Sequence, residues 1–584
     1  MSFSAQRTNG IATLDTDFTV NFFHLVISSL VINLLALAMP IMMLQTYDRI
    51  LPNYGYGTLT LLICGVVTAV ILEMILRIAR SYLTGWSGAV FEHSVSCNAL
   101  SHILRASMQP FEKQGSGAYL QKMASIGRLR AFYSGQALLT IVDLPFVLIF
   151  LLLIAHIAGN LVYVPLTLFG GFCLLAVMVG IKLKKEVQEQ DFSNKIRYNF
   201  IIETLSGIHT IKGLGLEKFF LRRSDRLQNR ISAAHYRVAL TNNIAQNCGT
   251  LFAQLMTVAV VSMGALKVID GQMGTGGLAA CVMLSGRIMQ PVQRALGLWT
   301  RFQSFFIDRR ELGDIFALPV TTQEDDSRLT APTGHLRFDN VSFGYSDHKL
   351  LFRGINFALS PGQSIAVSGT QGSGMTTFLH LVCGLLVPTG GSITVDGANP
   401  HQVDPGLLAS HIGYLPENGT IFFGTIRENL TFFGNVPEKD AMMAAKLLGI
   451  DEAVAVLPQG YDTQLTDNVT DPVPPGLKQR IAIARVLANK PRIILFDNAD
   501  RGLDKQGYNK VFQLLGRLKS KTVMIIISDD RNILRLADRE YYLHNGRLQE
   551  TAPADSKIHN TLPFRQFKVY PPVTEPAIEN TFHP

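Results

Sequence analysis

Residues 369 to 377 read Gly-Thr-Gln-Gly-Ser-Gly-Met-Thr-Thr. The stretch matches the phosphate-binding loop pattern G-x-x-x-x-G-K-[ST] at every position but one, because Met375 stands where the pattern has lysine. In such a loop, backbone N–H groups hold the phosphates and the lysine ammonium reaches the β- and γ-phosphates. Methionine has a similar length and no charge. The loop therefore predicts an α/β P-loop domain without its phosphate-binding cation.

The composition places part of the remaining chain in a membrane. Of the 584 residues, 48% are hydrophobic and only 16% are charged, whereas about a quarter are charged in soluble domains. We interpret the formal net charge of +8 as basic cytoplasmic loops of a membrane protein. A nucleic-acid-binding surface would instead need Lys and Arg clustered with aromatic residues. The six cysteines form no C-x-x-C pair, so neither a zinc site nor a disulfide framework is expected.

Six apolar stretches have the length of about 20 residues that crosses a bilayer. They lie at 20–45, 57–79, 137–158, 161–183, 248–269 and 275–297, the last being interrupted by Arg287. The two long gaps, near 84–136 and 184–247, carry many basic residues and few Gly or Pro breaks. We expect both to be helical extensions of the spans in the cytoplasm, on the same side as the N-terminus.

The ionisable residues inside the expected spans include two acids and two bases, Glu73, Arg77, Asp143 and Arg287. Glu73 and Arg77 are four residues apart, and we interpret them as an ion pair near a helix end. Asp143 and Arg287 lie nearer the middle of their spans. They are candidates for lining a translocation path, because charged residues inside a membrane often mark one.

The order of these features predicts five segments. They are a short N-terminal segment, a six-helix membrane domain, a polar linker, an α/β domain and a C-terminal tail, at 1–19, 20–310, 311–333, 334–552 and 553–584. Within the α/β domain, Ser364–Val367, Ile493–Phe496 and Val523–Ile527 are short apolar runs typical of a parallel sheet. The tail has several prolines and no periodicity, so we expect it to be disordered.

Six spans with two long cytoplasmic loops, followed by a P-loop domain, resemble one half of an ABC exporter over about residues 20–550. Leu44–Pro52 (Leu-Gln-Thr-Tyr-Asp-Arg-Ile-Leu-Pro) and Ile202–Glu217 are similar to the type I secretion exporters that handle RTX toxins, adhesins and proteases. Phe423–Leu430 resembles the family's segment after the Q-loop. Gly460–Thr463 and Gln479–Arg485 fit the helical subdomain around the signature.

Some members of this family carry a peptidase or peptidase-like domain before the first span. About twenty residues precede the first span here, which is too few for either domain. We therefore do not expect this chain to cleave a leader peptide or to recognise its substrate through such a domain.

The resemblance implies ATP and Mg²⁺ as cofactors and assigns roles to individual residues. Tyr345 corresponds to the aromatic ring that stacks on adenine. Thr376 and Asp497, the latter at the end of the Walker B strand, correspond to the groups that bind Mg²⁺. The residues expected to bind nucleotide are Tyr345, Gly369, Gly372, Gly374, Thr376 and Thr377. The D-loop keeps Asp504.

Several parts of the implied site are substituted, each where the family touches phosphate, metal or attacking water. Met375 replaces the lysine, Glu417 the Q-loop glutamine, and Asn498 the glutamate that polarises water. Asp529, or Ser528 if the alignment shifts by one residue, replaces the switch histidine. An asparagine amide cannot accept a proton. Losing the lysine's charge-assisted hydrogen bond, of about 1.5–3 kcal/mol, weakens nucleotide binding by about one to two decades.

The signature of the opposite site is also altered. Residues 473–477 read Val-Pro-Pro-Gly-Leu where the family has Leu-Ser-Gly-Gly-Gln. The serine hydroxyl is lost, and the two prolines remove N–H donors from a place where the motif offers them to an anion. Five substitutions in one set indicate that ATP binding is weak or absent and that hydrolysis by this chain is not expected.

The leading hypothesis is a catalytically degenerate half of a type I secretion exporter in the bacterial inner membrane, with the N-terminus and nucleotide-binding domain in the cytoplasm. The family implies a second ABC half-transporter, a membrane-fusion protein, an outer-membrane channel, a polypeptide substrate and the lipid bilayer as partners, and no nucleic acid. Two alternatives stay open. One is an ATP-hydrolysing homodimeric exporter, and the other is a membrane scaffold that recruits secretion components without transport.

Overall fold

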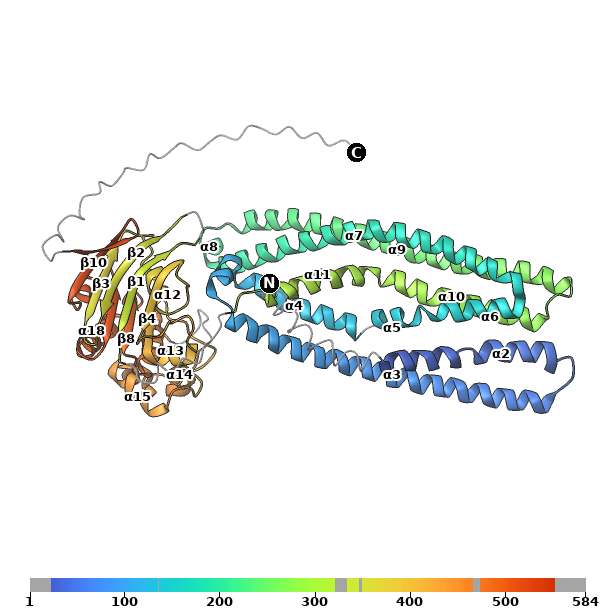
Figure 1. Cartoon of the computed structure of the whole chain (residues 1–584), viewed down its shortest axis with the longest axis horizontal. Coiled ribbons are helices and arrows are strands. Elements are labelled where there is room, and N and C mark those ends of the chain that lie inside the picture. The colour runs from blue at the N-terminus through green and yellow to red at the C-terminus, as the bar shows by residue number, and fades with distance from the viewer. Residues whose placement is uncertain (1–22, 135, 321–332, 346–348, 466–472, 552–584) are drawn as a thin grey trace, which may run out of the picture. The chain divides into compact units, whose positions relative to one another are not determined.

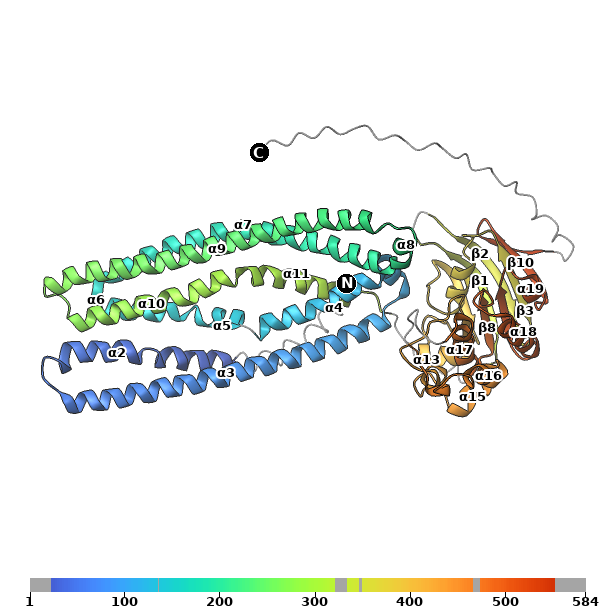
Figure 2. The same ribbon diagram turned by 180° about the vertical axis from the view of Figure 1, so that it is seen from behind.

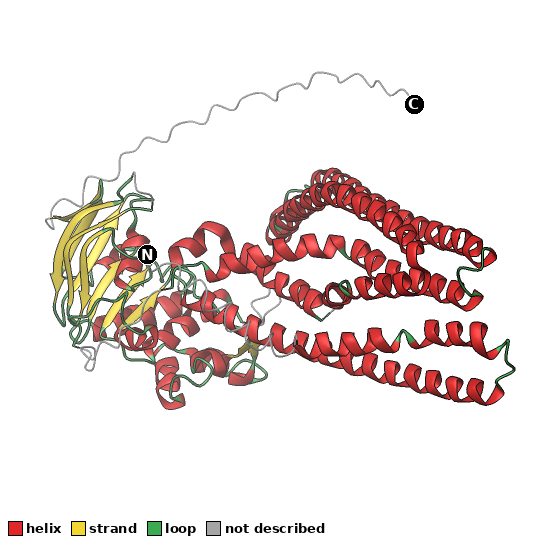
Figure 3. Ribbon diagram, turned by 45° about the vertical axis from the view of Figure 1, so that its right-hand side comes forward, coloured by secondary structure: helices red, strands yellow, loops and turns green. Residues whose placement is uncertain are grey.

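The computed structural model describes residues 23–134, 136–320, 333–345, 349–465 and 473–551. The chain divides into two compact units, Met1–Val320 and Thr321–Pro584. The first is built from long helices, and the second from β-sheets with helices around them (Figure 3). The expected N-terminal segment at 1–19 and the expected tail at 553–584 lie outside the described residues.

Long helices make up the first unit (Figure 1). Their bounds are α2 Ala38–Gln45, α3 Tyr56–Arg105, α4 Met108–Tyr133, α5 Gln136–Asp143, α6 Phe146–Ala158, α7 Tyr163–Ser206, α8 Ile208–Gly213, α9 Glu217–Ile269, α10 Thr275–Gly297 and α11 Trp299–Phe316. A π-helical turn, Thr46–Ile50, follows α2. The two long helices α7 and α9 run side by side in both views (Figures 1 and 2).

Four helical stretches among the described residues are long and apolar enough to cross a membrane: Phe23–Ile50, Tyr56–Arg105, Leu139–Ser206 and Glu217–Ile269. The third contains both of the spans expected at 137–158 and 161–183. Gly159, with φ of 54°, ends α6 between them, a conformation that glycine adopts readily. The sixth expected span is helical as α10, but it is not one of these four.

The prediction that the two long gaps are helical is confirmed. The helix α9 contains 53 residues, which at a rise of 1.5 Å per residue is about 80 Å. The apolar core of a bilayer is only about 30 Å thick. The helices therefore extend far beyond the membrane, as α3 and α7 also do with 50 and 44 residues.

The expected linker at 311–333 begins inside a helix. The helix α11 continues to Phe316, because Leu312 and Ile315 are buried against residues of α3 and α4, including Val95 and Ile126. Beyond the helix, the Pro319 carbonyl accepts a hydrogen bond from the Ser107 N–H at 2.9 Å. Only residues 317–320 and Thr333 of the expected linker are both described and outside a helix.

Two large sheets organise the second unit, besides a short antiparallel pair of β6 Gly424–Thr425 and β7 Gln464–Leu465. Strands β1 Leu336–Phe343, β2 Phe352–Leu359 and β4 Gly390–Val395 form an antiparallel sheet in the order β2-β1-β4. The larger sheet has the order β11-β10-β3-β9-β8-β5 and is parallel except for β10 with β11. Its strands are β3 Ser364–Gly369, β5 Ile412–Leu415, β8 Ile493–Asp497, β9 Val523–Ile527, β10 Arg539–His544 and β11 Arg547–Thr551.

The helices of this unit complete two hydrophobic cores. They are α12 Met375–Val382, α13 Pro405–His411, α14 Ile426–Leu430, α15 Glu438–Leu447, α16 Ile450–Val454, α17 Pro475–Leu487, α18 Lys505–Leu518 and α19 Arg531–Leu534. The three predicted strands are confirmed as β3, β8 and β9. All residues of β8 and β9 are buried, which explains why their sequences are continuously apolar rather than alternating.

The order of the parallel strands decides where the candidate site lies. Neighbouring parallel strands end at the same edge of a sheet, and ligands of such sheets bind beyond these carboxyl ends. Here the neighbours β3, β9, β8 and β5 are followed by residues 370–374, 528–530, 498–504 and 416–419. We call these four loops, together with Asp497, the phosphate edge.

Candidate nucleotide-binding site

The glycine loop keeps the backbone shape of a phosphate cradle. Gly372 and Gly374 have φ of 83° and 99°, a left-handed conformation that other residues adopt at a cost. A Cβ atom at Gly374 would also lie 2.8 Å from Leu351 Cδ2, and one at Gly369 would lie 2.6 Å from Ser373 Oγ. The helix α12 begins directly after Gly374, so its first N–H groups have no acceptor within the helix.

Met375 does not present a polar group to this cradle. Its side chain is partly buried and packs against the hydrophobic core that includes Phe378 and Val367. The residue that should supply a cation therefore contributes apolar contacts instead.

The two expected magnesium ligands, Thr376 and Asp497, lie next to each other. Asp497 is buried at the end of β8, and its Oδ1 accepts a hydrogen bond from Thr376 Oγ1 at 3.4 Å. The Tyr414 hydroxyl donates to Oδ2 at 3.0 Å. Burial, together with the Asp497 carboxylate, raises the pKa of Tyr414, so this hydroxyl stays protonated and remains a donor. Thr376 and Asp497 thus fit a small hard cation with oxygen ligands.

The expected adenine-stacking residue is also close to the loop. The Tyr345 hydroxyl lies 3.1 Å from Thr377 Oγ1, and the ring is exposed. Its edge contacts Phe343, with ring centroids 5.1 Å apart. The residues with retained nucleotide roles therefore gather around one end of α12.

The backbone holds Asn498, which the sequence pattern places at the position of the family's catalytic glutamate, directly after β8. It has φ of 48°, which asparagine tolerates better than most residues. Its N–H donates to the Ile527 carbonyl at 2.8 Å, and its carbonyl accepts from the Arg501 N–H at 3.1 Å. Its buried Oδ1 has no hydrogen-bond partner among the described residues. The amide offers no group that could take a proton from water.

Glu417 and Asp529, two of the substituted residues, share one ion-pair partner. Arg501 Nη1 donates to Glu417 Oε1 at 2.9 Å, and Arg501 Nη2 pairs with the Asp529 carboxylate. The hydrogen bonds to Glu417 and then Asp529 raise the pKa of Arg501. Ser528 instead is buried, with its Oγ 3.0 Å from both carboxylate oxygens of Asp500. Asp529 therefore lies at the surface and Ser528 points inward.

The stretch 473–477, which the sequence pattern assigns to the signature, is part of the hydrophobic core. Val473 and Leu477 are buried among residues of the second core, and Pro475 is the first residue of α17. A Cβ atom at Gly476 would lie 3.0 Å from the Asp504 backbone nitrogen, so the stretch contacts the D-loop closely. Apolar packing at Val473 and Leu477 is what the substitutions provide.

Sequence reasoning missed two residues that organise the site. Gln479 is buried, accepts from the Gly419 N–H at 2.7 Å and donates to the Pro416 and Ala499 carbonyls at 2.9 and 3.2 Å. Arg501 is the second. The sequence did contain a signal for Arg501. One basic and two acidic residues each follow a strand of the parallel sheet, and such a sheet can place the ends of these strands side by side.

The membrane unit contains a buried charge cluster that was only partly expected. Asp143 pairs with Arg80 at 3.4 Å and with Arg294 at 3.7 Å, and it accepts from Asn33 Nδ2 at 3.4 Å. The predicted ion pair of Glu73 with Arg77 is confirmed, but it lies inside α3 rather than near a helix end. A translocation role for Asp143 or Arg287 stays a prediction, since the contacts of Asp143 are those of a residue that joins helices.

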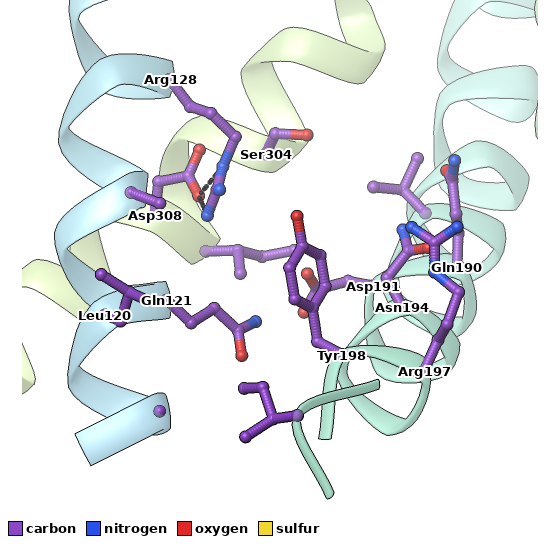
Figure 4. A pocket seen from close by; sticks show the side chains of 15 residues that line it. Leu120, Gln121, Arg128, Gln190, Asp191, Asn194, Arg197, Tyr198, Ser304 and Asp308 are labelled. Atoms are coloured by element: carbon purple, nitrogen blue, oxygen red, sulfur yellow. Dashed lines mark hydrogen bonds and ion pairs between the residues drawn. The ribbon is translucent and has the colours of Figure 1, made fainter. Parts of the chain in front are cut away.

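A cavity of about 470 Å³ lies between α4, α7 and α11 (Figure 4). Arg128 reaches across its wall to Asp308 at 2.7 Å, and Lys195 pairs with Glu311 at 2.6 Å. Tyr198 stands in the middle of the view and Gln121 points inward from α4. These ion pairs tie the extension of α7 to α11, and α11 to α4.

Known families account for both units. Residues 22–292 match the model of the ABC transporter transmembrane region, and residues 352–501 match that of the ABC transporter domain. The chain belongs to the ABC exporters. This membership makes it a membrane-spanning protein of the inner membrane, and an ABC transporter domain implies ATP and Mg²⁺ binding in general.

Among ABC exporters, the chain is homologous to type I secretion exporters of RTX toxins. It is 28% identical over 557 residues to the cyclolysin secretion/processing ATP-binding protein CyaB of Bordetella pertussis (strain Tohama I), covering 94% of this chain and 78% of that protein. It is 28% identical over 521 residues to the alpha-hemolysin translocation ATP-binding protein HlyB of Escherichia coli O157:H7, covering 89% and 74%.

A solved structure of a bacterial Atm1-family ABC exporter with ATP bound has the same fold, with a TM-score of 0.76 and 20% sequence identity. It covers 91% of this chain, which in turn covers 94% of it. The predicted fold class, a helical exporter domain followed by an α/β ABC domain, is confirmed. The roles assigned to individual site residues remain predictions of the sequence pattern.

Proposed function

We propose that this ABC exporter chain is a catalytically degenerate half of a type I protein secretion system, which pairs with an active ATPase half to export a polypeptide. The observation that carries the proposal is the charge of the phosphate edge. It contains a single basic residue, Arg501, and six carboxylates: Glu417, Asp497, Asp500, Asp504, Asp529 and Asp530. With Met375 in place of lysine, this edge repels a triphosphate more than it attracts one.

The fit to a magnesium nucleotide is therefore partial. The glycine cradle, Tyr345 and the adjacent Thr376 and Asp497 are suited to adenine, phosphates and Mg²⁺. When bound, Mg²⁺ would neutralise phosphate charge, which supports weak binding rather than none. Met375 and Glu417 act against it, so we expect an affinity well below that of a complete site.

The arrangement also lacks a group for hydrolysis. Asn498 has an amide at the position where the family has a proton acceptor. Ser528 has only a hydroxyl, which already donates a hydrogen bond to the Asp500 carboxylate. Neither side chain can act as a general base near neutral pH. We expect no turnover from the glycine loop and Walker B strand of this chain.

Pairing with a second ABC half follows from the family's head-to-tail dimers. A homodimer of this chain would contain two incomplete sites. In a heterodimer, one site would combine the partner's glycine loop with Val473–Leu477 of this chain, where Pro474 and Pro475 lack N–H donors. Turnover would then be reduced even there. A membrane-fusion protein, an outer-membrane channel and a cytoplasmic nucleotide-binding domain belong to the same proposal.

ATP hydrolysis by the purified full-length chain tests the proposal. We expect a rate no higher than that of Asp497→Ala, which removes the metal-binding carboxylate. A substantial rate that disappears in Asp497→Ala would overturn the proposal in favour of an active homodimeric exporter. Copurification from the native host distinguishes the remaining readings. A second half with lysine, glutamate and signature intact supports the heterodimer, whereas secretion components without such a half support a scaffold.

A further inference from the structure

Glu417 and Asp529, two positions at which this chain departs from its family, pair with one guanidinium, that of Arg501. The strands β9, β8 and β5 are neighbours in the large sheet. Arg501, in the loop after the middle strand, pairs with Glu417 in the loop after β5 and with Asp529 in the loop after β9. The family has an uncharged glutamine where this chain has Glu417. The three charges are therefore complementary, although 84 and 28 residues separate the partners along the chain.

Other contacts hold the same loops at their bases. Gln479 joins the Pro416 and Gly419 backbone to the Ala499 carbonyl. On the other side, Ser528 Oγ lies 3.0 Å from the Asp500 carboxylate and accepts from the Asp530 N–H at 3.0 Å. The buried side chains of Gln479 and Ser528 thus already join these loops in the interior. Arg501 joins the same loops at the surface, through its exposed ion pairs.

We propose that Arg501 is a positioning residue that holds the three loops 416–419, 498–504 and 528–530 in one arrangement without a nucleotide. The inference rests on the proposed function. In a complete site, phosphates and Mg²⁺ supply the charge that these loops surround. A chain that binds little nucleotide needs another charge between them, and the Arg501 guanidinium provides a cation between two carboxylates.

The ion pairs are exposed, so the proposal concerns loop order rather than global stability. The side chains of Arg501 and Glu417 are 44% and 42% exposed, and exposed pairs contribute little to unfolding free energy. A second bridge of the same kind offers a matched control. Arg427, also 44% exposed, pairs with Glu438 and Asp462, and none of these three residues belongs to the phosphate edge.

Hydrogen exchange on the purified full-length chain, with and without Mg-ATP, tests the proposal. We expect Arg501→Ala to speed exchange by about 2- to 10-fold in all three loops together. Arg501→Lys should restore part of the protection, because lysine keeps the charge but not the planar fork. In the unaltered chain, 0.5 M NaCl should raise exchange toward the level of Arg501→Ala, since salt screens exposed pairs. Arg427→Ala should leave the three loops unchanged.

An effect of Arg501→Ala confined to 498–504 would overturn the proposal, because the distant loops would not depend on the guanidinium. Equal salt sensitivity in the unaltered chain and in Arg501→Ala would also overturn it. Failure of the proposed function would look different. Mg-ATP would then protect the three loops of the unaltered chain strongly, and ATP turnover would accompany that protection, whatever the variant shows.

Discussion

At the scale of single residues, Met375 is the substitution whose effect on nucleotide affinity can be isolated. Its partly buried side chain already lies at the first position of α12, so a lysine there would start from the backbone position that the family uses. We expect Met375→Lys to tighten ATP binding by about 10- to 100-fold, the value of one charge-assisted hydrogen bond. Titration of the purified chain with a fluorescent ATP analogue would measure it.

The control for this change is Met375→Gln, which has a similar length and no charge. It should leave the affinity for the analogue nearly unchanged. Equal gains in both variants would show that the polarity of the side chain, rather than its charge, limits binding. No gain with lysine would mean that the carboxylates of the phosphate edge dominate.

Asp500 provides a residue-scale test by pH. Burial raises the pKa of Asp500 more than the hydrogen bond from Ser528 lowers it. The ionised form is therefore less favourable in the folded chain than in the unfolded one, and the cost is present above the ordinary pKa of about 4. We expect Asp500→Asn to raise the thermal unfolding midpoint at pH 7 by about 1–3 °C. The gain should shrink as the pH falls towards 4.

Asp538 should show the opposite sign. Burial alone would raise its pKa, but hydrogen bonds from Lys519 and Ser364 lower the pKa of Asp538 overall. Its ionised form stabilises the fold at neutral pH, and that contribution is lost as the pH falls through its folded pKa. Asp538→Asn should therefore lower the midpoint at pH 7. If Asp500→Asn and Asp538→Asn changed the unfolding midpoint at pH 7 in the same direction, the opposite pKa shifts of these two carboxylates would be contradicted.

At the scale of elements, the beginning of α17 places in the hydrophobic core a stretch that the sequence pattern assigns to the family's signature motif. Leu477 is buried in the second hydrophobic core, where the family places the glutamine of the signature. We expect Leu477→Ala to lower the unfolding free energy by about 2–4 kcal/mol, the usual cost of such a cavity. Leu477→Gln should also destabilise the fold, because it buries an amide. Thermal unfolding of the purified variants measures both.

Pro474→Ser is the matched change at the same helix end. Pro474 is exposed and occupies the position before the first residue of α17. Serine there can accept a hydrogen bond from the free N–H groups of the first turn, so the midpoint should be unchanged or higher. A large loss with Pro474→Ser and none with Leu477→Ala would reverse our account of this segment.

Elements with strong local patterns were predictable from the sequence, whereas contacts between loops were not. The strands β3, β8 and β9 are continuous apolar runs in the sequence. The stretches near 84–136 and 184–247 have few Gly or Pro breaks, which is typical of helices. The expected boundary after residue 310 falls inside α11, because the apolar residues Leu312 and Ile315 lie among charged ones in the sequence. The contacts of Arg501, Gln479 and Ser528 join loops that follow different strands. They depend on which strands are neighbours in the sheet, and a single sequence does not give that order.

At the scale of the whole membrane unit, one polar contact joins the segment Leu44–Pro52 to the start of α10. Asp48, in the segment Leu44–Pro52, accepts a hydrogen bond from the Gly276 N–H at 2.7 Å at the start of α10. A Cβ atom at Gly276 would lie 2.5 Å from the Leu44 carbonyl oxygen, so only glycine allows this approach. The sequence segment that resembles type I secretion exporters therefore has a structural reason for its aspartate.

The buried cluster around Asp143 joins more helices and gives the final prediction. The side chains of Arg80 and Asp143 are only 6% and 7% exposed, and Arg294 on α10 is the third charge. We expect Asp143→Asn to lower the stability of the purified chain by about 3–5 kcal/mol, because it leaves Arg80 buried without a counter-charge. Glu73→Gln, in the more exposed i,i+4 pair with Arg77, should cost no more than about 0.5 kcal/mol.

This comparison also decides between two roles for Asp143. If it joins helices, as its contacts with Arg80, Arg294 and Asn33 indicate, Asp143→Asn should lower the unfolding midpoint and the amount of folded chain in membranes together. If it lines a translocation path, export of the substrate in the native host should fall while both of those quantities stay the same. Because the Asp143 side chain is only 7% exposed and its contacts are with residues of its own chain, we expect the first outcome.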